Sequence, residues 1–215
     1  MDFGEFVLAA STADLADEPA AREHADAVEF RMDNRPTWEG GEADGGDGAG
    51  DPANRDRLRT LARAAERHAV EAIDVELATA REQDGRHTIE AARDHGAAVV
   101  VSSHDFEGTP GGDGLRERLD AATDAGDVGK LAVTAEDAGD VLRLLSVTLE
   151  FAQGGDRVAT MAMGEAGRHS RAVAPLYGSR IGYAPVDPAD ATAPGQYDLA
   201  TLRGLVDRLG GKPEG

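Results

Sequence analysis

Short apolar runs recur along the chain, and polar segments with helical periodicity lie between them. We expect strands at seven of these runs: Glu5–Ser11, Ala27–Asp33, Ala72–Ala78, Ala97–Ser103, Val128–Thr134, Val158–Gly164 and Arg180–Ala184. Apolar residues at spacings of three and four predict helices over Arg55–His68, Gly114–Ala125 and Ala138–Phe151. Alternating strands and helices are typical of a parallel sheet with crossover helices, either a doubly wound sheet or a (β/α) barrel.

One interval between strands is longer than the others and contains the segment Glu39–Asn54, EGGEADGGDGAGDPAN. It lacks apolar periodicity, which predicts a mobile loop. Its acids do not have the spacing of an EF-hand, so we favour a solvated acidic loop over a calcium site. The first strand is not followed by Gly-x-Gly-x-x-Gly, and no Walker-type loop occurs, which argues against nucleotide binding.

Composition narrows the class of protein. The 215 residues include 41 acidic and 22 basic side chains, a net charge of -19, and no cysteine. Such a polyanion disfavours binding to nucleic acid or to a membrane surface. Neither an apolar membrane span nor an export leader is evident, so we expect a cytoplasmic protein with one domain, 1–215. Dispersed acids and few lysines indicate adaptation to high salt, whereas the periodic apolar segments argue against disorder.

Charged side chains fall at the expected carboxyl ends of strands, where parallel sheets carry their functional groups. Glu29, Arg31 and Asp33 alternate along one strand, and Asp74 and Glu76 along another, so each set shares a face. In isolation, Glu29 and Arg31 also fit a solvated edge, and Asp74 also fits a brace for neighbouring backbone. Buried charges are costly unless they are paired, so together these side chains favour a functional site.

Lys130 is one of only two lysines, beside 20 arginines, and it lies inside an apolar strand. An arginine would serve a salt bridge there equally well, but a lysine can lose its proton and attack a carbonyl. We expect burial and nearby cations such as Arg31 or Arg171 to lower the pKa of Lys130. This chemistry predicts a Schiff base to a ketone.

Two further groups suit that chemistry. His104 follows the neighbouring strand and can move a proton, although a lone histidine there is also commonly structural. Glu76 can hold its imidazole in one tautomer. Ser170 and Arg171 are expected to bind a substrate carboxylate, and Gln196 in the turn TAPGQ a hydroxyl, although that turn also fits an ordinary loop.

These segments resemble the type I 3-dehydroquinate dehydratases over almost the whole chain. The motifs are VEFRMD, RPTWEGG, IDVEL, VVSSHDFEGTP, GKLAV, MAMGEAGRHSR, YGSRIGYA and APGQ, in the order of that family. SSHDFEGTP and MGEAGRHSR are highly specific, and GKLAV is weaker by itself. The resemblance implies a (β/α)8 barrel, commonly dimeric, that dehydrates 3-dehydroquinate to 3-dehydroshikimate in the shikimate pathway without a metal or organic cofactor.

Residue by residue, the resemblance implies that Lys130 forms an imine with the C3 ketone. His104 removes a proton from C2 and assists departure of the C1 hydroxyl, with Glu76 orienting it. The substrate-binding positions implied are Glu29, Arg31, Arg35, Arg171, Thr192 and Gln196.

The sequence departs from the family at two points. Thr192 stands where the family usually has serine, which retains a hydroxyl. Only Asn34 separates Asp33 from Arg35, where the family has a helix and a further barrel strand. We therefore expect one strand and helix to be missing there, which leaves the barrel open and its activity in question. Alternatives are a class I aldolase-like lyase and a catalytically impaired barrel.

Overall fold

The computed structural model describes residues 1, 3–31, 52–187, 189, 193 and 195–210. In these ranges the strands are β1 (Val7–Thr12), β2 (Ala27–Phe30), β3 (Ala72–Glu76), β4 (Ala98–Asp105), β5 (Val128–Thr134), β6 (Val158–Met163) and β7 (Ile181–Pro185). The helices are α1 (Glu18–Ala21), α2 (Pro52–Ala65), α3 (Leu77–Ala80), α4 (Gln83–Asp94), α5 (Gly112–Ala125), α6 (Ala138–Gly154), α7 (Gly164–Gly167), α8 (Ser170–Val173) and α9 (Leu199–Leu209). Two 3-10 turns, η1 (Leu15–Asp17) and η3 (Ala174–Tyr177), complete the elements.

Each of the seven expected strands is confirmed, with ends shifted by a few residues. The expected loop Glu39–Asn54 is wrong at its end, because α2 already begins at Pro52. Proline suits the first turn of a helix, where its missing N–H costs nothing. The rest of that segment lies outside the described residues.

All strand pairs are parallel and fall into two sheets, ordered β2-β1-β7 and β3-β4-β5-β6. A bridge between Val158 and Ser179 joins β6 to the segment before β7. When the two sheets are joined at that bridge, the strand order is β2-β1-β7-β6-β5-β4-β3. This is the order of a (β/α) barrel that, in the described residues, is open between β2 and β3. In the described residues β2 and β3 are sheet edges, so the barrel is not closed; the break that we expect at Asp33–Arg35 lies outside those residues.

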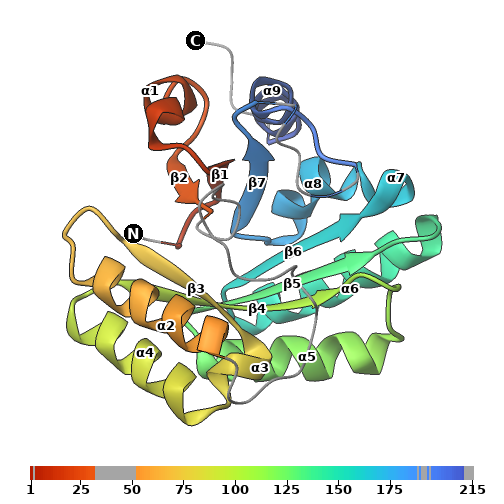
Figure 1. Ribbon diagram of the computed structural model, residues 1–215. Helices are drawn as coiled ribbons and strands as arrows, with labels where there is room; N and C mark the ends of the chain where they lie inside the picture. The colour runs from red at the N-terminus through yellow and green to blue at the C-terminus, as the bar shows by residue number, and fades with distance from the viewer. Residues whose placement is uncertain (2, 32–51, 188, 190–192, 194, 211–215) are drawn as a thin grey trace.

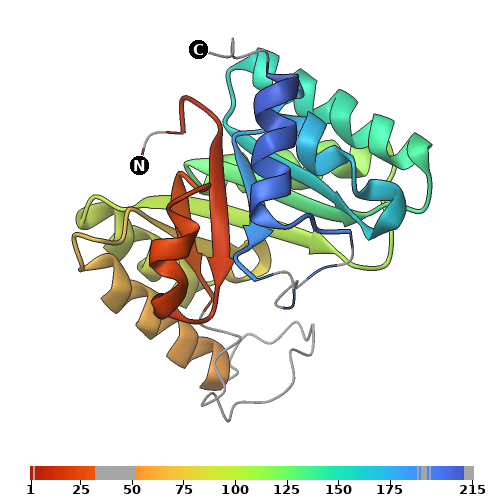
Figure 2. The ribbon, with the colours of Figure 1, turned by 90° about the horizontal axis from the view of Figure 1, so that it is seen from above.

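The two sheets face each other across a common interior (Figures 1 and 2). Helices α2, α4, α5 and α6 cover the outer face of the four-stranded sheet, and α1 and α9 lie against the smaller one (Figure 1). No helix in the described ranges combines the length and apolar character that a membrane crossing requires.

Alternation along each strand decides which side chains enter this interior. On β5, Leu131 and Val133 belong to the outer core beneath α5 and α6, so Lys130 and Ala132 face inward. At the amino ends of the strands the interior is filled by apolar side chains from both sheets and from the segment before β1: Phe3, Val7, Ala9, Val100, Val128, Ala159 and Ile181. Polar groups therefore enter the interior only nearer the carboxyl ends.

Gly129 fixes the position of β5 against α5. A Cβ at this residue would lie 2.9 Å from the backbone nitrogen of Thr123 and 2.6 Å from its methyl carbon. The close approach of helix and strand thus requires glycine at the position next to Lys130.

Candidate active site

Strand register gathers the polar residues of three neighbouring strands. Glu76 of β3 is paired with Ser102 of β4, and Ser102 with Lys130 of β5. Paired residues in adjacent parallel strands point to the same face, so all three side chains enter the interior. The expected shared face of Asp74 and Glu76 is confirmed, because Ile73 and Val75, which alternate with them along β3, are buried in the outer core.

Lys130 is buried, with 7% of its surface exposed, and its amine forms an ion pair with Asp74. Nζ donates to Asp74 Oδ2 at 2.7 Å and lies 4.5 Å from the centre of the Tyr183 ring on β7. The amine therefore lies between the two sheets, held by a carboxylate on one side and an aromatic face on the other.

This environment corrects the expected pKa of Lys130. Burial lowers the pKa, but the charges of Asp74, Tyr183 and Glu29 outweigh it and raise the pKa above its ordinary value. The expectation of a lowered pKa from neighbouring cations was wrong, because the group nearest the amine is an anion. For Asp74, burial raises the pKa, and the Lys130 charge with hydrogen bonds from Lys130 and Ser102 lowers it overall.

A chain of hydrogen bonds links this ion pair to His104. The Ser102 hydroxyl lies 2.6 Å from Asp74 Oδ1 and 3.1 Å from Glu76 Oε2. Glu76 Oε2 is 2.9 Å from His104 Nδ1, so the expected pairing of these two residues is confirmed. With Nδ1 bound to Glu76, Nε2 is the nitrogen left for proton transfer. The imidazole also stacks on Phe106, with ring centres 5.7 Å apart.

Arg171 on α8 is a buried cation, 5% exposed, beyond the end of β6. In the described part of the chain its Nε has no hydrogen-bond partner and no carboxylate lies within 4.0 Å of its guanidinium. Burial lowers its pKa to about 10, so it remains charged at neutral pH. Its position fits an anionic ligand, because a buried charge without a partner is costly.

Ser170 does not share that role. Its hydroxyl is fully buried and accepts a hydrogen bond from the backbone N–H of Ala162 at 2.9 Å. The expectation that Ser170 binds a carboxylate beside Arg171 was wrong, because the hydroxyl fastens the short helix to β6 instead.

Of the remaining predicted residues, some have contacts in the structure and others lie outside the described residues. Glu29 on β2 accepts a hydrogen bond from Ser11 of β1, its register partner, and contributes to the electrostatic field at Lys130. Arg31 follows β2, where its backbone N–H bonds to Thr12. Gln196 accepts from the N–H of Ala193. Asp33, Arg35 and Thr192 lie outside the described residues.

Sequence reasoning missed one interior group and assigned no role to a second. Tyr183 faces the interior from β7, and Ser102 joins the two carboxylates. Alternation within GYAP and SSHD was the available signal, because it places both side chains on the inner face once the strands are assigned.

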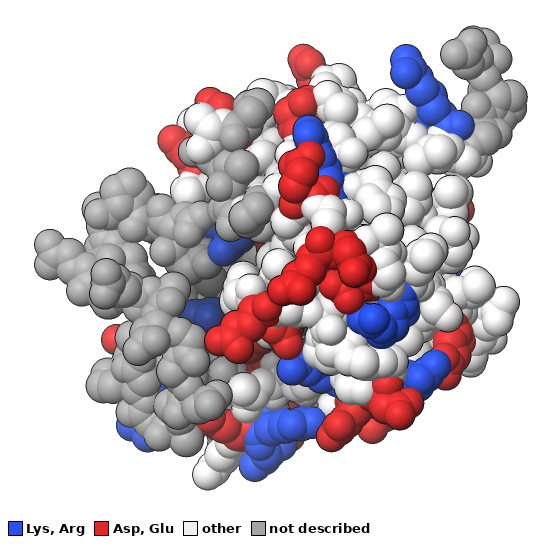
Figure 3. Space-filling view, turned by 90° about the vertical axis from the view of Figure 1, so that its right-hand side faces the viewer, with Lys and Arg blue, Asp and Glu red and all other residues white. Residues whose placement is uncertain are grey.

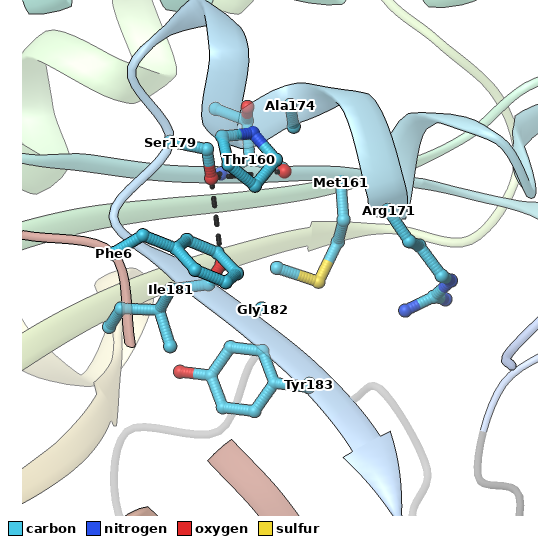
Figure 4. A pocket seen from close by; sticks show the side chains of 10 residues that line it. Phe6, Thr160, Met161, Arg171, Ala174, Ser179, Ile181, Gly182 and Tyr183 are labelled. Carbon is cyan, nitrogen blue, oxygen red and sulfur yellow. Dashed lines mark hydrogen bonds between the residues drawn. The ribbon is translucent and has the colours of Figure 1, made fainter. Parts of the chain in front are cut away.

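A small cavity lies beside this site, between β6 and β7. Figure 4 shows Met161, Phe6 and Tyr183 around it, with Arg171 to the side of Met161. Within the described residues, no group of three or more His, Asp or Glu side chains has an arrangement suited to a metal ion.

Comparisons with known proteins agree with this geometry. The family model "Type I 3-dehydroquinase" matches residues 34–213. A 3-dehydroquinate dehydratase of Haloarcula marismortui is 54% identical and covers 97% of this chain and 98% of its own; that of Halobacterium salinarum is 46% identical, with 97% and 100% covered. The crystal structure of 3-dehydroquinate dehydratase from Geobacillus kaustophilus superposes with a TM-score of 0.79 at 23% identity, covering 98% of this chain and 93% of that one.

The comparisons also bear on the expected break. The match to the Haloarcula protein spans 233 aligned residues, more than the 215 of this chain, so that relative has residues without a counterpart here. The family match begins at residue 34, next to Asp33. The fold is that of a (β/α)8 barrel, which in the described residues is not closed between β2 and β3, and the chain belongs to the type I 3-dehydroquinase family.

Proposed function

We propose that this protein dehydrates 3-dehydroquinate to 3-dehydroshikimate, a step of the shikimate pathway, through a Schiff base on Lys130. The observation that carries the proposal is a buried lysine whose amine lies in the barrel interior, one strand away from a histidine held by a carboxylate. The family and the 54% identical haloarchaeal 3-dehydroquinate dehydratase support the same reaction.

In this mechanism the Lys130 amine attacks the C3 ketone, and water leaves as the imine forms. The imine withdraws electrons from C2, whose proton passes to His104. The C1–O bond then breaks as a double bond forms between C1 and C2, and His104 returns the proton to the departing hydroxyl. Water finally hydrolyses the imine, which releases 3-dehydroshikimate and restores the Lys130 amine. Glu76 stabilises the imidazolium through Nδ1 at 2.9 Å.

Substrate recognition follows from the charges around the amine. Arg171 binds the carboxylate, because its guanidinium is buried, charged and distant from carboxylates of the described chain. Glu29, Arg31, Arg35, Thr192 and Gln196 contact ring hydroxyls or shape the pocket.

The whole chain, 1–215, acts as one domain and requires no metal or organic cofactor. We place the protein in the cytoplasm of a salt-adapted cell as a homodimer, without affinity for nucleic acid or membrane. The net charge of -19 and the haloarchaeal relatives support the adaptation to salt.

Borohydride trapping tests the mechanism. Incubation with 3-dehydroquinate and borohydride should leave a stable adduct on Lys130, located by mass spectrometry of the digested protein. His104→Ala should abolish turnover yet still allow trapping, since the imine forms before proton removal. Lys130→Arg, which keeps a charge but cannot form an imine, should give neither adduct nor turnover. Normal turnover with unmodified Lys130 would contradict the mechanism.

A second candidate is a barrel that binds the substrate without converting it. It is favoured by the sheet edges at β2 and β3, since an interrupted barrel can displace Arg31 and the residues that follow. Calorimetric binding of 3-dehydroquinate without product formation by the wild-type chain would support this candidate over the enzyme.

A further inference from the structure

Asp74 is the carboxylate closest to the reacting nitrogen, yet the mechanism above gives it no task. Its Oδ2 accepts from Lys130 Nζ at 2.7 Å, and its Oδ1 accepts from Ser102 at 2.6 Å, so both oxygens are held in place. We propose that Asp74 is a catalytic partner of Lys130, which takes a proton from the ammonium and later serves as the counterion of the protonated imine. This inference rests on the proposed function.

The need for such a partner follows from the charge state of the lysine. An ammonium has no lone pair and cannot attack a ketone. Within the ion pair, one proton moves from Nζ to Oδ2, which leaves an amine beside a carboxylic acid. The amine adds to the ketone carbon, and a second nitrogen proton passes to the carbonyl oxygen. Asp74 then returns its proton to that oxygen, the C–O bond breaks, and water leaves.

The sequence of steps returns the original charges. A positive nitrogen, now an iminium, faces a negative Asp74, as the ammonium did at the start. Charge is therefore never left alone in the interior, where Lys130 is only 7% exposed. An isolated cation there would be costly, and the pairing with Asp74 offsets much of that cost. The protonated imine is also the form that withdraws electrons most strongly from C2.

Ser102 keeps Asp74 in the position that these steps require. Its hydroxyl proton lies between Asp74 Oδ1 and Glu76 Oε2, and Glu76 in turn holds His104. Besides Lys130, the titratable or charged groups near this pair are His104 and Glu76 on neighbouring strands, Tyr183 on β7 and Glu29 on β2.

The test is Asp74→Asn, which keeps the shape of the side chain and removes its charge. Without that negative charge, burial has the larger effect on the pKa of the Lys130 nitrogen and lowers it, so the imine loses its proton at lower pH. We expect the alkaline limb of the kcat profile to move down by about one pH unit or more, and kcat at neutral pH to fall about ten-fold or more, with KM changed much less. Borohydride trapping on Lys130, followed against pH, should shift with the kcat profile.

Two controls separate charge from structure. Asp74→Glu keeps the carboxylate and should return the alkaline limb toward that of the wild type. Asp113→Asn removes a carboxylate from the exposed start of α5 and should leave both profiles unchanged. Profiles of Asp74→Asn that superpose on the wild type would overturn the role of Asp74, while wild-type trapping and turnover would leave the proposed function intact. Failure of the wild type itself to turn over and trap would instead reject the proposed function.

A measurement on the wild type covers the case in which Asp74→Asn does not fold. Acylation of Lys130 by acetic anhydride, read by mass spectrometry against pH, should reach its midpoint at higher pH in the folded protein than in the urea-unfolded chain. A lower midpoint in the folded protein would show that Asp74 does not hold the ammonium, and would overturn the inference.

Discussion

At the scale of single residues, burial and charge conflict most at Arg171. The guanidinium is 5% exposed, and its Nε has no partner in the described residues. A neutral side chain of similar size would pack there at lower cost, so the charge is best explained by a ligand. An arginine also offers two parallel N–H groups, which match the two oxygens of a carboxylate.

Arg171→Lys should therefore weaken substrate binding although it preserves the charge. We expect KM for 3-dehydroquinate to rise about ten-fold, because one charge-assisted hydrogen bond of about 1.5 kcal/mol is lost, while kcat changes little. Steady-state kinetics measure both values. Arg180→Lys is the matched control, since Arg180 bonds to the backbone oxygen of Gly4 and should leave KM unchanged. An unaltered KM in Arg171→Lys would remove Arg171 from carboxylate binding.

Sequence reasoning reached some of these residues and missed others for a physical reason. Lys130, Glu76 and His104 follow from strand periodicity and residue chemistry, which are local properties. The ion pair of Lys130 with Asp74 depends on which side chains meet across β3, β4 and β5. This register cannot be predicted from the sequence of any single strand. The assignment of Ser170 failed similarly, because its partner Ala162 belongs to the preceding strand.

At the scale of elements, β5 and α5 approach so closely that one hydrogen atom fills the space at Gly129. Glycine in a strand usually weakens it, but here it permits the contact that sets the depth of Lys130 in the interior. Strand periodicity predicted seven strands correctly and left this contact unseen. The number of strands is a local property, whereas their spacing from helices is not.

Gly129→Ala should consequently destabilise the fold and impair catalysis together. The added methyl meets backbone at 2.9 Å, so β5 or α5 must shift, at a cost of about 1 to 3 kcal/mol in the free energy of unfolding. Urea unfolding measures the stability, and the initial rate of borohydride trapping reports the displaced lysine. Gly96→Ala tests a different cost, since a Cβ there meets nothing within 4 Å but the residue has φ of 81°. It should lower stability without slowing trapping, and equal effects of both variants on trapping would contradict this account.

At the scale of the whole molecule, the net charge of -19 acts against compactness. Figure 3 shows acidic side chains in a band across one face, with basic side chains mostly toward its lower rim. Repulsion among such charges is screened by salt, because the Debye length falls from about 10 Å at 0.1 M to about 3 Å at 1 M.

Raising potassium chloride from 0.1 M to 1 M should increase the melting temperature. If reduced repulsion raises the free energy of unfolding by about 2 kcal/mol, the melting temperature of a chain of this length rises by about 5 °C. Differential scanning calorimetry measures the shift, and a matched series in sucrose controls for solute exclusion without screening. A melting temperature that stays constant or falls in potassium chloride would reject salt adaptation as the reason for the acidic composition.

The single seam between β6 and β7 gives the substrate a mechanical task as well as a chemical one. In the described residues the two sheets are joined along that seam by the Val158–Ser179 bridge and by the hydrogen bond from the Thr160 N–H to the Ser179 hydroxyl. On the inside they are joined by apolar packing and the Lys130–Tyr183 contact. A substrate bonded to Lys130 on one sheet and also to Glu29 or Arg31 on the other would link the two sheets directly. The bound substrate would then stabilise the arrangement of the two sheets, and the substrate-free enzyme would be less rigid than the substrate-bound one.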